Sequence, residues 1–194
     1  HARLLAQTAT GLSLQSSDLD NLDLDLGHYT ATNSGITTNN RHAIHANYAR
    51  VQSGSATFAG GVYRFSPHWK GSLYAARFDD VWNQYYAGTD FTYPLADQLA
   101  LIGDLNYYKA VDEGRQQLGS FNNSIWSGKL GVRYGAHTLA VSHQRNNGDD
   151  DFDYLRQSDS IFLDNSIQYS DFNSPKERSW MVRYDLNMSS YGIP

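Results

Sequence analysis

The chain has 194 residues, a formal net charge of −5 and no cysteine, and its 14 tyrosines far outnumber its 4 prolines. Although 40% of the residues are hydrophobic, the mean hydropathy is −0.56, and no apolar run approaches the roughly 20 residues of a membrane-spanning helix. This composition excludes a helical membrane protein, and the acidic balance argues against a nucleic-acid partner. The length predicts a single domain, covering residues 1–194.

The N-terminal part alternates apolar and polar residues. Leucines occupy every second position in residues 11–15 and again in residues 22–26, with aspartates between them in the second run. A period of two is typical of a β-strand with one apolar face, so we expect two antiparallel strands joined by a turn at residues 17–21. The following segment, residues 30–55, is rich in Asn, Thr, Ser and Gly and is predicted to be a long loop.

The same alternation recurs along the rest of the chain. Six further strands are predicted at residues 56–65, 71–79, 85–93, 99–108, 126–134 and 138–144. The last predicted strand, residues 179–189, places Trp180 and Val182 on one face and Arg183 and Asp185 on the other. About nine antiparallel strands are therefore expected, and the fold class is all-β.

The predicted connections alternate in length. Short turns at residues 66–68, 94–97 and 135–137 alternate with long polar segments, of which 145–178 is the longest. Loops that are long at one end only, together with aromatic residues near strand ends, are typical of a transmembrane antiparallel β-barrel in a bacterial outer membrane.

A soluble antiparallel barrel or sandwich is the alternative, because it would show the same alternation. We disfavour it because the second face carries many charges and the apolar face contains little Ile or Phe for a packed core. Bacterial single-chain barrels have an even number of strands. Nine strands would not close, so we expect the chain to be a fragment that lacks N- and C-terminal strands.

Several short runs in unbroken order resemble the porin D (OprD-type) family of outer-membrane channels. They are residues 7–11 (QTATG), 27–29 (GHY), 84–86 (QYY), 112–114 (DEG), 152–154 (FDY), 159–163 (DSIFL), 168–173 (QYSDFN) and 179–187 (SWMVRYDLN). The resemblance covers essentially the whole chain, which looks like the middle of such a porin.

The resemblance implies a monomeric eighteen-stranded barrel, surrounded by outer-membrane lipid and lipopolysaccharide, whose third, fourth and seventh external loops fold inward to narrow the pore. Such channels pass small carboxylate-bearing solutes, including basic amino acids or aromatic acids and in some cases carbapenems. They act by passive, substrate-selective diffusion without a cofactor, so no enzyme activity is expected.

The resemblance also implies a substrate path through the inward loops. Its residues would be Arg3, Tyr48, Asp159, Ser160, Ser166, Tyr169 and Asp171. An arginine can present a planar fork to a carboxylate, whereas aspartates attract ammonium or guanidinium groups, and hydroxyls can replace part of a solute's hydration. Each serine or aspartate could instead cap a turn.

Basic residues on the predicted strands are candidates for the pore wall rather than residues matched to the family. They are Arg77, Lys129, Arg133 and Arg183. The arginines that guide carboxylates through such pores belong mainly to other strands, so these four do not identify the solute.

An enzyme alternative arises because the family has also been classed as a serine peptidase, with His28, Asp80 and Ser160 as the matching triad. A triad needs the imidazole within hydrogen-bond reach of both the hydroxyl and the carboxylate. The alternation instead places His28 on the face of Leu24, and Asp80 on the face of Tyr74, which is predicted to contact lipid. Ser160 lies in a predicted loop inside the pore, so the triad is disfavoured.

Two clusters could suggest a metal site. Residues 149–151 are all aspartate and Asp153 follows, but the closing glutamate and the spacing of an EF-hand are missing. His42 and His45 lack an obvious third ligand. We therefore predict no metal site, and we interpret the aspartates as a solvated external loop that divalent ions could bridge to lipopolysaccharide.

Overall fold

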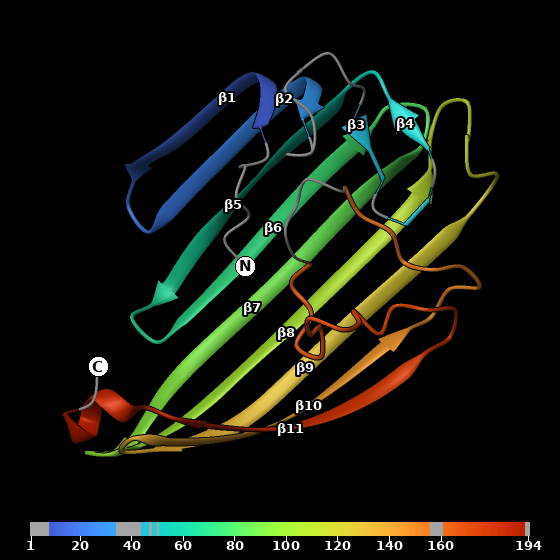
Figure 1. The fold of residues 1–194 in the computed structure, drawn as a ribbon. Helices are drawn as coiled ribbons and strands as arrows, with labels where there is room; N and C mark the ends of the chain where they lie inside the picture. Colours follow the sequence, from blue (N-terminus) through green and yellow to red (C-terminus); the bar gives the residue numbers. More distant parts are fainter. Residues whose placement is uncertain (1–7, 34–43, 47, 50, 156–160, 193–194) are drawn as a thin grey trace.

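The computed structural model describes residues 8–33, 44–46, 48–49, 51–155 and 161–192. Its main element is one nine-stranded antiparallel sheet in which neighbours in the sequence are neighbours in space (Figure 1). The strands are β1 (Thr8–Leu19), β2 (Leu22–Asn33), β5 (Ala56–Ser66), β6 (Trp69–Phe78), β7 (Trp82–Ala96), β8 (Leu99–Asp112), β9 (Asn122–Tyr134), β10 (His137–Asn146) and β11 (Arg178–Leu186).

Smaller elements complete the described part of the chain. Strands β3 (Ile44–His45) and β4 (Gln52–Ser53) pair with each other inside the segment that the sequence predicted to be loop, and a 3₁₀ helix, η1 (Met188–Tyr191), follows β11. No helix in the described ranges is long and apolar enough to cross a membrane. The all-β prediction and the nine strands of the sheet are confirmed.

The connections at the two ends of the sheet differ in length. Two-residue turns join β1 to β2, β5 to β6, β7 to β8 and β9 to β10, all at one end. At the other end lie the segments 34–55, 113–121 and 147–177, and the three-residue turn 79–81 between β6 and β7 is the exception. By the usual orientation of outer-membrane barrels, the short turns face the periplasm and the long loops face outward.

The outer face of the sheet is apolar. Between the two ends it exposes Leu73, Leu105, Leu130, Leu139, Val141 and Val182. Aromatic residues gather on the same face toward the short turns, at Tyr63, Phe65, Trp69, Tyr93, Tyr134 and Tyr184, and toward the long loops, at Tyr85, Tyr107, Trp126 and Trp180. Two aromatic bands around an apolar zone are what a membrane barrel presents to lipid.

The inner face corrects one assignment made from the sequence. Tyr74 and Phe78 were predicted to contact lipid, but Tyr74 donates a hydrogen bond to Asp25 and Phe78 is buried against the long-loop segments. Leu73, which is 70% exposed, is the residue that lies outside. The prediction was wrong because β6 carries apolar side chains on both faces, so that polarity did not distinguish them.

Tyr74 lies across a neighbouring strand. Asp25, Gly60 and Tyr74 are cross-strand partners on β2, β5 and β6, and the Tyr74 hydroxyl reaches Asp25 at 2.7 Å. A Cβ placed on Gly60 would lie 2.3 Å from the Tyr74 ring. The ring can therefore lie flat against the wall only because residue 60 has no side chain.

The core lies between the inner face of the sheet and the long-loop segments. One cluster packs Ile44 and Ala46 against Phe78 and Trp82, and a second packs Phe152, Ile161 and Leu163 against residues of β8 and β9. Figure 1 shows the segment after β10 lying over the sheet rather than extending away from it. The loops therefore fill part of the space that the inner face borders.

Candidate solute pathway

Buried amides hold residues 171–173 against the inner face of β10. Gln144 donates hydrogen bonds to the carbonyl oxygens of Asp171, at 2.5 Å, and Phe172, at 3.0 Å. Asn146 donates to the carbonyl of Asn173, at 2.7 Å, and both amide side chains are fully buried. Because an unpaired buried amide is costly, these bonds fix the path of the loop backbone.

A charged cluster anchors the same loop to β8 and β9. The Lys129 ammonium contacts the carboxylates of Asp104 and Asp164, the latter at 2.7 Å. Ser127 donates to the Asp164 carboxylate at 3.0 Å and accepts a hydrogen bond from its backbone N–H at 3.1 Å. Lys129 thus lies on the inner face, as predicted, but its charge is already paired between the wall and the loop.

Asp171 is the point at which the two inward segments meet. Its carboxylate accepts hydrogen bonds from the hydroxyls of Tyr48, at 2.5 Å, Tyr154, at 2.8 Å, and Ser166. Within the described ranges it makes no ion pair with a cation. We call these four residues the Asp171 cluster; its carboxylate is held by three hydroxyl donors.

The backbone beneath this cluster is held by a second aspartate. The Asp153 carboxylate accepts hydrogen bonds from the N–H groups of Tyr48, at 2.9 Å, and Ala49, at 2.7 Å. The Tyr48 and Tyr154 rings meet edge to face with their centroids 5.8 Å apart. Burial, reinforced by the hydrogen bonds to Asp171, raises the pKa of both tyrosines above its ordinary value, so they stay protonated donors.

The structure brings only some of the predicted path residues together. Tyr48, Ser166 and Asp171 form one cluster, whereas Tyr169 is 93% exposed and forms no hydrogen bond with the cluster in the part of the chain that the structure describes. The remaining predictions, Arg3, Asp159 and Ser160, lie outside the described residues.

Two of the predicted wall residues, besides Lys129, also lie on the inner face. Arg183 contacts the carboxylate of Asp185, its neighbour on β11, at 2.8 Å. Arg133 is exposed, and it has no carboxylate partner in the part of the chain that the structure describes. Arg133 is therefore an available positive group on the inner wall.

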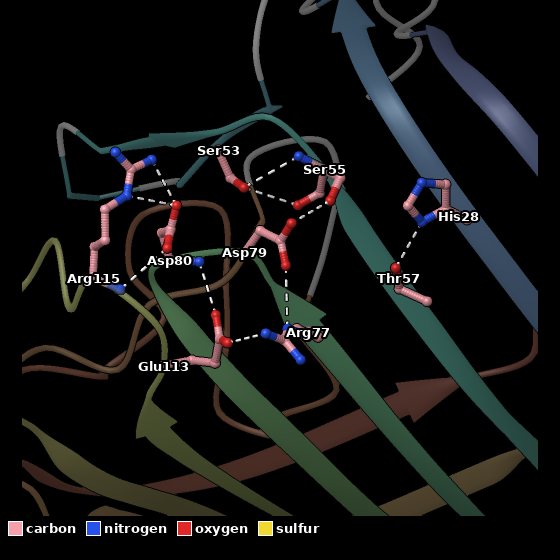
Figure 2. A network of polar contacts seen from close by, with 9 residues as sticks. All are labelled: His28, Ser53, Ser55, Thr57, Arg77, Asp79, Asp80, Glu113 and Arg115. Carbon is pink, nitrogen blue, oxygen red and sulfur yellow. Dashed lines mark hydrogen bonds and ion pairs between the residues drawn. The ribbon is translucent and has the colours of Figure 1, made fainter.

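Arg77 does not lie on the inner wall, which corrects that prediction. It shares the face of Leu73, and its guanidinium contacts Asp79, at 3.1 Å, and Glu113 at the long-loop rim (Figure 2). Alternation alone could not place it, because both faces of β6 carry apolar residues near the rim.

The rim network ties the short 79–81 turn to the loop after β8. Glu113 also accepts a hydrogen bond from the backbone N–H of Asp80 at 2.8 Å, and the Asp80 carboxylate binds the Arg115 guanidinium at 2.6 Å (Figure 2). The hydrogen bonds from the Arg115 side chain and backbone lower the pKa of Asp80. Asp80 is therefore part of this hydrogen-bond and ion-pair network at the rim. The prediction that it faces lipid was wrong.

The structure does not assemble the alternative triad. His28 lies on the outer face, as predicted, and its Nδ1 is 2.8 Å from the Thr57 hydroxyl. Figure 2 shows His28 and Asp80 at opposite sides of the view with different partners. Ser160 lies outside the described residues. Within the described part of the chain, no group of three or more His, Cys, Asp or Glu side chains is placed to hold a metal ion.

Several residues of the candidate pathway were not predicted from the sequence. Tyr154 belongs to the FDY run, which was noted only as a resemblance, and Asp164 was not singled out. Gln144 and Asn146 follow the inward parity of β10, but nothing in that parity indicates that a loop covers them.

Comparisons with known proteins agree along the whole chain. The family described as "outer membrane porin, OprD family" matches residues 1–194. Porin D of Pseudomonas aeruginosa is 43% identical over 201 residues, covering 100% of this chain and 45% of the relative. The Porin-like protein GalP of Pseudomonas putida is 30% identical, covering 99% of this chain and 47% of its own.

Solved structures give the same result. The crystal structure of Pseudomonas aeruginosa OprD matches with a TM-score of 0.90 and 43% identity, covering 100% of this chain and 49% of that one. The crystal structure of Pseudomonas aeruginosa OccD3 (OpdP) matches with a TM-score of 0.94 and 33% identity, covering 100% of this chain and 47% of that one. The chain thus spans about half the length of the relatives that it matches.

Proposed function

Since the chain belongs to the OprD family of outer membrane porins, we propose that it supplies part of the wall and the constriction of a channel in the bacterial outer membrane. The channel passes small carboxylate-bearing solutes by passive, selective diffusion. The proposal includes a complete monomeric barrel of eighteen strands, of which nine are described in this chain. Relatives of about twice this length support it.

The observation that carries the proposal is the Asp171 cluster. It joins the segment before β5 to the segment after β10 on the polar side of a sheet whose other side is apolar. A pore selects by its width and by the charges and hydrogen-bonding groups that line it. Loops that are hydrogen-bonded to each other across the inner face narrow the width and supply both charges and hydrogen-bonding groups.

The charges on the inner face fit a solute with two charged ends. Among the described residues, Arg133 offers a guanidinium without a carboxylate partner, and Asp171 offers a carboxylate that forms no ion pair. Arg133 lies six residues, roughly 20 Å, along the wall from the level of Gln144, which binds the Asp171 backbone. A basic amino acid would therefore meet the two groups in succession, through its ammonium or guanidinium at Asp171 and its carboxylate at Arg133. An aromatic acid or a carbapenem could use Arg133 through its carboxylate.

Single-channel current through the full-length protein in a planar bilayer tests this function. We expect brief blockades when arginine or benzoate is added. Asp171→Asn should shorten the arginine blockades by about tenfold, the loss expected for one charge-assisted hydrogen bond, and leave benzoate less affected. Arg133→Gln should weaken the blockades by arginine and those by benzoate.

The result against the proposal is equally clear. Folded protein that shows no conductance would contradict the proposed channel function. Open channels that neither solute blocks would support the proposed pore but contradict the proposed class of solutes.

A further inference from the structure

Two arginines face each other on the outer side of the sheet, where lipid is expected. Arg145 on β10 and Arg178 on β11 are cross-strand partners and share the parity of Val141, Val182 and Trp180. Like charges directly opposite each other on one face destabilise a strand pair. No described carboxylate forms an ion pair with either arginine, so this pair needs an explanation.

The environment of Arg145 sharpens the problem. Arg145 is partly buried, and its Nε is a buried nitrogen with no hydrogen-bond partner in the described part of the chain. A buried guanidinium nitrogen without an acceptor is costly. The buried Nε cannot itself reach an external acceptor, but the accessible part of the Arg145 side chain lies beside the exposed Arg178, so the two arginines can share one.

The position of the pair along the strands indicates the acceptor. His143 stacks on Trp180 with their ring centroids 4.3 Å apart, and Trp126 meets His143 edge to face at 5.3 Å. Such outer-face aromatics sit at the level of lipid headgroups. Arg145 and Arg178 lie two residues, about 7 Å, farther toward the long loops, where the phosphates of the outer leaflet begin.

We propose that Arg145 and Arg178 form a binding site for a phosphate group of lipopolysaccharide in the outer leaflet. The planar forks of two adjacent guanidinium groups can each hold two oxygens of one phosphate. The bound anion removes the repulsion between them, and the stacked Trp180 and His143 contact the sugar or acyl part below. Each phosphate held in this way does not need a bridging divalent cation.

The site differs from the external contact suggested by the sequence. Residues 149–151, all aspartate, could reach lipopolysaccharide only through divalent ions, because carboxylates and phosphates repel each other. The arginine pair binds the phosphate directly. The two modes therefore differ in their response to a chelator.

The test uses the full-length channel in phosphatidylethanolamine nanodiscs containing EDTA, with diphosphoryl lipid A as the probe and native mass spectrometry to measure its retention. We expect the double variant R145Q/R178Q to bind lipid A about tenfold more weakly than the unmodified channel, since two charge-assisted contacts are lost. The matched control R133Q removes an inner-face arginine and should bind normally. Fully dephosphorylated lipid A should bind the unmodified channel as weakly as diphosphoryl lipid A binds the double variant.

Several results would overturn the site. Equal retention by the double variant would do so, and so would complete release of lipid A from the unmodified channel by EDTA. Displacement by millimolar inorganic phosphate would assign the pair to a free anion instead. Folding is checked by migration of unheated protein on a detergent gel, and R178Q alone, at an exposed position, provides a milder variant if the double change prevents folding.

Discussion

The two halves of the inner face carry the same kind of ion pair in different surroundings. On β6 and β7, Lys70 and Asp90 are 3.5 Å apart and each about half exposed. On β8 and β9, Lys129 is 28% exposed between Asp104 and Asp164, and the Asp164 side chain is only 5% exposed. The difference is the loop that covers the second pair, which removes most of the solvent from its charges.

Lys129→Met should have the largest effect, because it leaves two carboxylates facing each other beneath the loop. Removing one partner of a buried charge cluster costs about 3–5 kcal/mol. We expect lower resistance to urea unfolding in lipid vesicles and a noisier open-channel current. The control Lys70→Met, on the uncovered half, should change stability by less than about 1 kcal/mol. Equal effects of the two substitutions would refute the distinction between the halves.

Asn146→Ala tests the neutral anchors of the same loop. The substitution leaves the buried carbonyl of Asn173 without its side-chain donor, which should destabilise the protein by about 1–3 kcal/mol. Proteolysis of the folded channel should then cut within residues 147–177 more readily. Ser72→Ala, on the uncovered half, is the control. Unchanged cleavage would mean that Asn146 does not hold the loop.

Ser166→Ala removes one of the three hydroxyl donors to Asp171. Because Tyr48 and Tyr154 remain as donors, we expect the free energy of unfolding to fall by only about 0.5–1.5 kcal/mol. A double-mutant cycle with Asp171→Asn measures the coupling directly. A coupling of zero would show that the serine acts independently of the cluster.

A shift to high pH should have the smallest effect. The raised pKa of Tyr48 and Tyr154 means that their stabilising contribution is fully present below the ordinary tyrosine value of about 10 and is lost progressively as the pH rises from there through the raised pKa. Any decline of arginine blockade between pH 8 and pH 10 should therefore be the same in the unmodified channel and in Tyr48→Phe, because it comes from deprotonation of the α-amino group of arginine itself. A decline centred near pH 10 in the unmodified channel, but absent from Tyr48→Phe, would contradict the raised pKa.

The sequence predicted the fold more completely than the site, for a physical reason. Alternation assigns one face of a strand to lipid, which placed Trp180 and Val182 correctly, and the strand order followed from the short turns. It failed for Tyr74 and Arg77, because β6 is mixed on both faces. Strand ends were also missed: β7 begins at Trp82 and ends at Ala96, beyond the predicted 85–93.

The constriction could not follow from periodicity at all. Asp171 and Tyr48 are separated by 123 residues, and only the resemblance to the family connected them. The path of a loop depends on side-chain hydrogen bonds such as those of Gln144, whose acceptors are backbone carbonyls. A sequence contains no pattern for such acceptors.

The Tyr74 ring, lying flat over Gly60, also has an electrical consequence. The resistance of a pore rises as the cross-section open to ions falls. Any side chain at residue 60 would collide with the ring, which would have to stand away from the wall and narrow the conducting path. In the proposed channel, the absence of a single methyl group would thus help to set how much current passes this part of the wall.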